Sequence, residues 1–318
     1  MRFLLDTEQR ALARSLHAML TAADTPSVIR DWGRGDHRSG RALWARLAEA
    51  GVFGLAVAEA YDGTGPLPVE LAVAFVELGR HAVPGPLVET VAAAALLTEP
   101  GLAKRFLPAL VAGETMATVA VTEYALDGDA ATLHLALCPD GLRLSPGPGP
   151  ARACLDPARR LTTLTAGGEL LTPAPPLARA VTWARLATAA QALGIGLALL
   201  DRTVGYVGQR TQFGVPIGSF QAVKHRLADA KTALEFARPL LFGAALTMDP
   251  ADVAAAKLSA CEAAYTTARA ALQLHGAIGY TAEYDLSLWL TRARALRTAW
   301  GGPDECRDLV LKRGVGRW

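Results

Sequence analysis

The sequence contains few cysteines, few aromatic residues and no excess of charge of one sign. The four cysteines, Cys138, Cys154, Cys261 and Cys306, lie far apart and form neither a CxxC pair nor a Cys/His cluster. This spacing indicates neither a zinc site nor a disulfide framework. Lys and Arg total 32 against 30 Asp and Glu, which gives a formal net charge of +2. The basic excess that is typical of nucleic-acid-binding proteins is therefore missing.

Long hydrophobic runs are also missing. The most apolar stretch, Leu186–Leu200, is rich in Ala and Gly and is flanked by Arg185 and Asp201, so it is not expected to span a membrane. The N-terminal sequence MRFLLDTEQRALARSL has no apolar core of signal-peptide length. These features predict a cytoplasmic protein without membrane contact.

What the chain does contain is small and aliphatic residues. Its composition is 51% apolar but only 6% aromatic, so the core must consist largely of Ala, Leu and Val. Such a core is large enough to exclude global disorder, and it suits closely packed helices better than sheets.

Residues 1–117 are predicted to form an N-terminal helical domain. Apolar residues recur there at helical spacing, and each break falls at Gly or Pro, as at Gly51 and Pro84–Pro86. The expected helices begin at Thr7 and then cover Leu43–Ala50, Val69–Leu78, Leu87–Leu97 and Leu102–Val111.

Residues 118–176 are predicted to form a small central β domain, because eight of the 19 prolines fall between Pro139 and Pro176 and exclude long helices. Short alternating segments at 132–137, 141–144 and 161–165 are typical of an antiparallel sheet. Residues 177–318 return to helical spacing and are predicted to form a helical bundle. Its helices are expected at Leu177–Gln209, Phe220–Thr247, Ala251–His275, Leu286–Arg297 and Asp304–Arg313.

Two segments of the C-terminal part carry a specific resemblance. Gln209–Asp229, QRTQFGVPIGSFQAVKHRLAD, is similar to the RxQFGxPIxxFQxxxHxLAD pattern of the acyl-CoA dehydrogenase family. Gln273–Asp285, QLHGAIGYTAEYD, resembles the family's QxHGGxGyTxE pattern. Leu47–Gly63 and Val119–Glu123 also fit, so the similarity covers nearly the whole chain in the correct order.

The resemblance implies a mainly α fold with a small β domain: an N-terminal helical domain, a truncated central β domain and a C-terminal four-helix bundle that forms the oligomer. It implies FAD as cofactor, an acyl-CoA thioester as substrate and an electron-transfer protein as acceptor. The implied reaction is α,β-dehydrogenation.

The resemblance also implies which residues contact the cofactor. Arg210 would reach the FAD diphosphate of a neighbouring subunit, where a guanidinium offers a planar fork of donors. Phe213 would pack on the adenine, and Thr122 would touch the flavin ring. The full implied set is Arg210, Gln212, Phe213, Gln221, Gln273, Gly276, Gly279 and Thr122.

Structural roles remain open for several of these positions. Arg210 could be a solvated cation at a helix end, and Phe213 a core aromatic residue. Gly276 and Gly279 could merely end a helix, and Thr122 could cap a strand.

The sequence departs from the family at the catalytic base. The two positions where family members carry the proton-abstracting Glu align with Gly301 and Ala184. Glu283 and Glu305 are weak substitutes. The segment after Glu123 is also short, and no Trp occurs between Trp44 and Trp183 to cover the flavin.

These departures favour one hypothesis over two others. The chain resembles the short, degenerate subunit of bacterial α2β2 acyl-CoA dehydrogenases, which completes the FAD site of a full-length, base-carrying partner. Such enzymes include those that act on bulky or steroid side-chain acyl-CoA substrates. The alternatives are a catalytic homo-oligomer with a relocated base and a flavin-free scaffold subunit.

Overall fold

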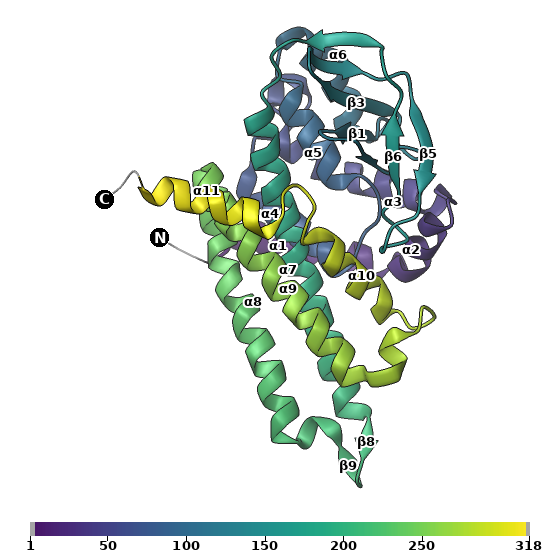
Figure 1. The fold of residues 1–318 in the computed structure, drawn as a ribbon, viewed down its shortest axis with the longest axis vertical. Helices are drawn as coiled ribbons and strands as arrows, with labels where there is room; N and C mark the ends of the chain where they lie inside the picture. The colour runs from purple at the N-terminus through teal and green to yellow at the C-terminus, as the bar shows by residue number, and fades with distance from the viewer. Residues whose placement is uncertain (1–3, 316–318) are drawn as a thin grey trace. The chain divides into compact units, whose positions relative to one another are not determined.

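The computed structural model describes residues 4–315 and forms two compact units (Figure 1). The outermost residues of the predicted N-terminal and C-terminal domains, 1–3 and 316–318, lie outside the described residues. One unit consists of residues 22–71 and 83–187, and the other of residues 1–21, 72–82 and 188–318. Helices α4 (Pro68–Arg80) and α7 (Leu177–Gln209) contribute to both.

The first unit combines helices with two small sheets. Its helices are α2 (Thr25–Gly33), α3 (Arg38–Glu49), α5 (Leu87–Leu96) and α6 (Pro100–Val111). Its four-stranded sheet has the order β1 (Ala117–Ala120), β3 (Leu133–Cys138), β4 (Gly141–Leu144), β7 (Glu169–Thr172). Its three-stranded sheet has the order β2 (Ala125–Leu126), β6 (Leu161–Leu164), β5 (Pro148–Arg152). Short 3-10 turns occupy Val52–Ala56 and Glu59–Tyr61.

The sheets correct the prediction of one antiparallel sheet. Strands β3, β4 and β6 lie where alternation predicted them, but β1 runs parallel to β3. All four residues of β1 are buried, so it shows no polar alternation, as is usual for a parallel strand. Strand β5 contains Pro148 and Pro150 and lies at the edge of its sheet, where proline is tolerated. Neither strand carries the alternating signal on which the prediction relied.

The second unit is helical. It contains α1 (Thr7–Thr21), α8 (Gln221–Thr247), α9 (Pro250–His275), α10 (Leu286–Leu296) and α11 (Pro303–Val315), with the later parts of α4 and α7. The short strands β8 (Thr211–Gln212) and β9 (Val215–Pro216) join α7 to α8. The predicted C-terminal helices are confirmed to within a few residues at each end.

Glycine allows α7 to lie against its neighbours in this unit. A Cβ on Gly194 would lie 2.0 Å from the carbonyl oxygen of Val76 in α4, and one on Gly79 would lie 2.2 Å from that of Gln191. A Cβ on Gly196 would lie 2.4 Å from Leu234 Cδ2 in α8. These separations are far below van der Waals contact. A larger residue at Gly194 or Gly79 would push the backbones of α7 and α4 apart, and one at Gly196 would displace the Leu234 side chain.

Helix α7 is the one helix of the described chain that is long and apolar enough to cross a membrane, with a mean hydropathy of 1.3 over its most apolar window. That window is fully buried within the structure, which is the pattern of a core helix.

Asp127 is a buried carboxyl group in the first unit. Its Oδ1 accepts a hydrogen bond from the Arg160 N–H at 2.9 Å, whereas Oδ2 is buried without a hydrogen-bond partner among the described residues. Burial raises the pKa of Asp127 to about 7, because the charged form loses its hydration.

Asp127 should make stability depend on pH. Between pH values of about 4 and 7 the folded chain retains a proton that the unfolded chain has lost, so the free energy of unfolding falls as pH rises through this range. We predict that Asp127→Asn removes this dependence and stabilises the chain at pH 8 by on the order of a few kcal/mol, with little effect at pH 4.5. Urea unfolding at the two pH values measures the difference. Asp62→Asn is the control. Asp62 is exposed and, like Asp127, has positive φ, so this substitution should leave the pH dependence of stability intact.

Candidate functional site

The hairpin between α7 and α8 carries the first resembling motif. Phe213 and Gly214 form its two-residue loop and both have positive φ, 55° and 82°. Positive φ at both loop residues is typical of a type I′ turn, a conformation that Gly and Asn adopt easily and Phe does not. The Phe213 side chain is nevertheless 93% exposed. The prediction that it could be a core aromatic residue is wrong, since this strained phenylalanine contacts solvent.

Arg210 lies at the base of this hairpin. Its N–H donates to the Tyr206 carbonyl at 2.9 Å, and its carbonyl accepts from the Ile217 N–H at 2.8 Å, so its backbone closes the hairpin onto the end of α7. The guanidinium is exposed and has no hydrogen-bond or ion-pair partner among residues 4–313. A helix C-terminus favours a nearby cation. The Arg210 guanidinium, just after α7, therefore remains available to bind an anion.

The glycine loop follows α9 and carries the second motif. Gly276 ends α9 with φ 65° and ψ −140°, a combination that only glycine adopts readily. Gly279 is buried, and a Cβ there would lie 3.1 Å from Leu272 Cδ1. Ile278 and Tyr280 between and after them are 43% and 77% exposed. Gly276 therefore does end a helix, and the loop after it presents apolar side chains to solvent.

The structure brings these two motifs to the same end of the bundle (Figure 1). The Tyr206 ring of α7 stacks on His275 of α9 with centroids 4.1 Å apart. The guanidinium of Arg226 in α8 donates a short hydrogen bond to Gln273 Oε1. Sequence reasoning missed Arg226 and His275, although both lie inside the resembling segments.

His275 is a buried imidazole at this end. Its Nδ1–H donates to the Ala271 carbonyl at 2.8 Å, which leaves the lone pair on Nε2. Burial lowers the pKa of His275, so the ring is neutral near pH 7. Its Nε2 has no partner among the described side chains and backbone groups.

The remaining predicted cofactor residues are scattered. Gln212 and Gln221 are exposed, in β8 and in the first turn of α8. Thr122 is exposed and follows β1 in the other compact unit.

At the two positions predicted to lack the base, the local structure suits the residue that is present. Ala184 is a buried helical residue of α7. Gly301 has φ 115° in the turn between α10 and α11, and its carbonyl accepts a hydrogen bond of 2.6 Å from Lys257 Nζ. Lys257 is 1% exposed and also donates to the Arg297 carbonyl at 3.5 Å, so a buried ammonium group holds this turn. Glu283 and Glu305 are exposed.

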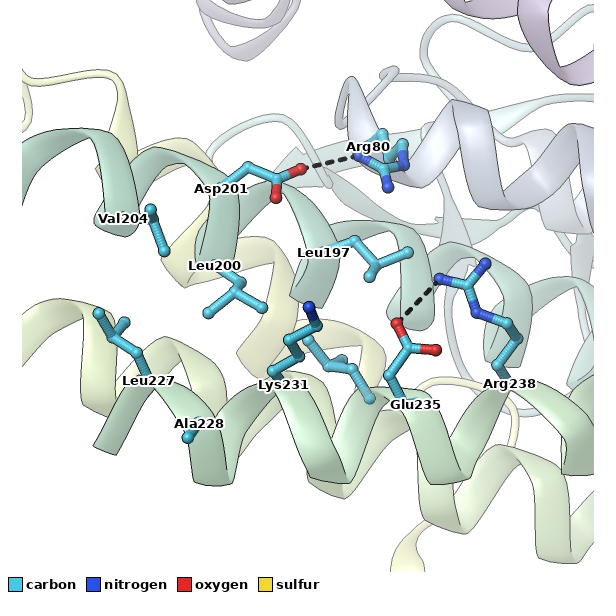
Figure 2. Close-up of a pocket in the computed structure, with 11 residues that line it drawn as sticks. Arg80, Leu197, Leu200, Asp201, Val204, Leu227, Ala228, Lys231, Glu235 and Arg238 are labelled. Carbon is cyan, nitrogen blue, oxygen red and sulfur yellow. Dashed lines mark hydrogen bonds and ion pairs between the residues drawn. The ribbon is translucent and has the colours of Figure 1, made fainter. Parts of the chain in front are cut away.

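A separate groove of about 550 Å³ lies between α7 and α8 in the same unit (Figure 2). Leu197 and Leu200 line its apolar side, and Lys231 extends into it from α8. Arg80 pairs with Asp201 at 2.9 Å on its rim. None of the predicted cofactor residues lines this groove.

Comparison with known proteins places the chain in a family. Residues 6–114 match the acyl-CoA dehydrogenase N-terminal domain, and residues 177–316 match the acyl-CoA dehydrogenase C-terminal domain. The acyl-CoA dehydrogenase IpdE2 of Mycobacterium tuberculosis is 35% identical over 315 residues, which cover 96% of each chain. The chain belongs to the acyl-CoA dehydrogenase family. The resemblance stated from the motifs is thereby confirmed.

Two solved structures of acyl-CoA dehydrogenases (ACADs) resemble this chain at 25% identity. One chain of the ChsE4-ChsE5 complex of M. tuberculosis superposes with a TM-score of 0.86, and the match covers all of this chain and all of that one. A variant of the Tcur3481-Tcur3483 steroid ACAD superposes with a TM-score of 0.83, covering 97% of this chain and 99% of the other. The predicted fold, mostly helical with a small central β region, is confirmed.

Relief of strain at Phe213 gives a stability prediction. Phe213→Asn supplies a residue that tolerates the left-handed conformation and creates the Asn-Gly pair favoured in this turn. We expect the free energy of unfolding of the isolated chain to rise by about 1 kcal/mol, since a left-handed residue costs roughly 1–2 kcal/mol. Urea unfolding measures the change. Phe236→Asn, at a 70% exposed phenylalanine inside α8, should give no such gain. A loss of stability in Phe213→Asn would show that the ring is held by contacts within this chain.

Proposed function

We propose that this chain is the base-lacking subunit of a heteromeric acyl-CoA dehydrogenase and that it completes an FAD site seated mainly in a homologous, base-carrying partner. The family's reaction requires a carboxylate that removes the α-proton of the thioester. FAD, when bound, supplies the acceptor for the β-hydride. The chain itself would contribute cofactor-binding groups and a surface for the partner.

The conformation of Gly301 carries this proposal. Its φ of 115° lies where residues with a side chain are strained, and its carbonyl is held by the buried Lys257. A glutamate could not occupy this turn without rearrangement of the backbone. The other position is filled by Ala184, which is buried and has no group that could accept a proton. Both observations support a chain that works without a base of its own.

The hairpin and the glycine loop fit the demands of a dinucleotide. An unpaired guanidinium, that of Arg210, offers fixed charge for a diphosphate. Next to it, Phe213 presents an aromatic face at a cost in backbone strain, a combination that is typical of functional positions. Gln273, Gly276 and Gly279 lie at the same end of the bundle and would let backbone approach the ligand. Thr122, Gln212 and Gln221 remain proposed contacts on the family resemblance alone.

Exposed apolar side chains support assembly with another chain. Phe236, Leu240 and Leu246 are 70%, 47% and 60% exposed, and all three lie in the second half of α8. Exposed apolar side chains on one helix are typical of an interface, and the hairpin before α8 exposes a further one, Phe213. The structural relatives ChsE4-ChsE5, a complex, and Tcur3481-Tcur3483 also support assembly with a second, different chain. Similarity to Tcur3481-Tcur3483, a steroid ACAD, supports a bulky, steroid side-chain acyl-CoA as the substrate class.

The first test concerns activity. We predict that the purified chain, supplied with excess FAD, does not reduce an electron-acceptor dye with any acyl-CoA, whereas the chain co-purified with a base-carrying homologue does. Loss of a general base costs about 10²–10⁴-fold in rate. Replacement of the partner's glutamate by Gln should abolish turnover while the complex stays assembled.

A different outcome would identify the alternative enzyme. One such outcome is that this chain alone turns over substrate and loses that activity in Glu283→Gln or Glu305→Gln. Such a result would mean that the base has moved, and the hypothesis of a catalytic homo-oligomer would replace ours. A folded complex that never retains flavin would favour the scaffold reading.

The second test concerns Arg210. Arg210→Ala should lower the flavin content of the assembled complex, because truncation of a buried charge partner costs about 2–5 kcal/mol in binding. Arg210→Lys should retain less flavin than the parent chain, since an ammonium group lacks the planar fork. Arg269→Ala, at an exposed arginine of α9, is the matched control. Unchanged flavin absorbance in Arg210→Ala would assign Arg210 a purely structural role.

A further inference from the structure

Three side chains that can ligate a metal meet between α1 and the end of α4, outside the sites described above. His17 comes from α1, Glu77 from the last turn of α4, and His81 directly follows that helix. All three belong to the same compact unit. Glu77 and His81 are four residues apart, which places them on one face of the helix end.

The separations between these atoms are those of ligands around one small cation. His17 Nδ1 lies 3.1 Å from Glu77 Oε2 and 3.2 Å from His81 Nε2. A tetrahedral zinc ion with ligands at about 2.0–2.1 Å has ligand-to-ligand distances of about 3.3 Å. All three ligand atoms lie within 4.8 Å of one another, so small side-chain adjustments would place them around one ion.

Hydrogen bonds alone do not satisfy this arrangement. An imidazole nitrogen has either one proton or one lone pair, directed along one line in the plane of the ring. His17 Nδ1 nevertheless faces both an acceptor, Glu77 Oε2, and a second ring nitrogen, His81 Nε2. A proton shared between the two makes two weak, poorly aligned bonds. A cation accepts a lone pair from all three groups at once.

Two arginines lie near these ligands, and each has another partner. Arg80 lies 3.7 Å from the other carboxylate oxygen of Glu77, but it pairs more closely with Asp201, at 2.9 Å. Arg202 lies over the Trp289 ring at 3.7 Å from its centroid. The His17 side chain is 53% exposed, so a metal has access from solvent and water can complete its coordination.

We propose that His17, Glu77 and His81 form a binding site for a divalent transition metal of the zinc class. Two imidazoles and one carboxylate are a ligand set that zinc prefers. Leu16 and Leu20, which flank His17, are buried, so the metal would fasten a helix that is already seated. The site is structural: it links α1 to α4 and is independent of the FAD function proposed above.

Titration of the full-length, tag-free chain with Zn²⁺ tests the site. Calorimetry should show one Zn²⁺ per chain, and Co²⁺ should give the visible absorption of a tetrahedral complex. Loss of a group that only supports a metal ligand weakens metal binding roughly 10–100-fold. His17→Asn and Glu77→Gln each remove a ligand itself, so each should weaken Zn²⁺ binding by more than that. Zn²⁺ should raise the melting temperature of the parent chain and not that of His17→Asn.

The control is His225→Asn, which removes an exposed histidine of α8 in the same unit. It should bind Zn²⁺ like the parent chain. Because His17 is half-exposed, His17→Asn is expected to fold, and circular dichroism verifies this. Absence of stoichiometric binding, equal binding by His17→Asn, or an equal loss in His225→Asn would overturn the proposal.

Discussion

The close approach of α7 to its neighbours is the constraint on which the helical unit depends. At Gly194 and Gly196 there is no space for even one added carbon, because the backbone of α4 and a leucine of α8 occupy it. Glycine in a helix interior costs roughly 0.5–1 kcal/mol relative to alanine, and the packing gained between helices offsets that cost. The Arg210 hairpin leaves the bundle at the end of this same helix.

Helices were predictable from the sequence because their ends are set locally. Gly and Pro interrupt an apolar spacing of 3.6 residues, so α7, α8 and α9 could be located to within a few residues. Strands β1 and β5 could not, because β1 is buried on every side and β5 carries prolines in place of alternation. Their positions are set by pairing with distant strands, which no local pattern records.

The candidate site was likewise predictable only in part from the sequence. Motif similarity indicated Arg210, Phe213 and the glycine loop, and the turn at Gly214 follows from its sequence. The bond from Arg226 to Gln273 joins residues 47 positions apart, and the contact of His17 with His81 spans 64. A spacing rule for metal ligands or hydrogen bonds covers only a few residues, so such pairs emerge only from the fold.

Phe213 and Lys257 show that the hairpin and the Gly301 turn are stabilised in different ways. Lys257 is a buried ammonium group satisfied by backbone carbonyls of the turn that holds Gly301, so this region has been stabilised from within the chain. The hairpin differs: Phe213 is exposed in a strained conformation, and the ring contact that it makes among the described residues is an edge contact with Phe220 at 6.3 Å. Backbone strain at an exposed residue is a pattern that occurs at functional positions. The Gly301 turn is therefore held from within the chain, whereas the hairpin leaves Phe213 exposed to the ligand and partner that we propose.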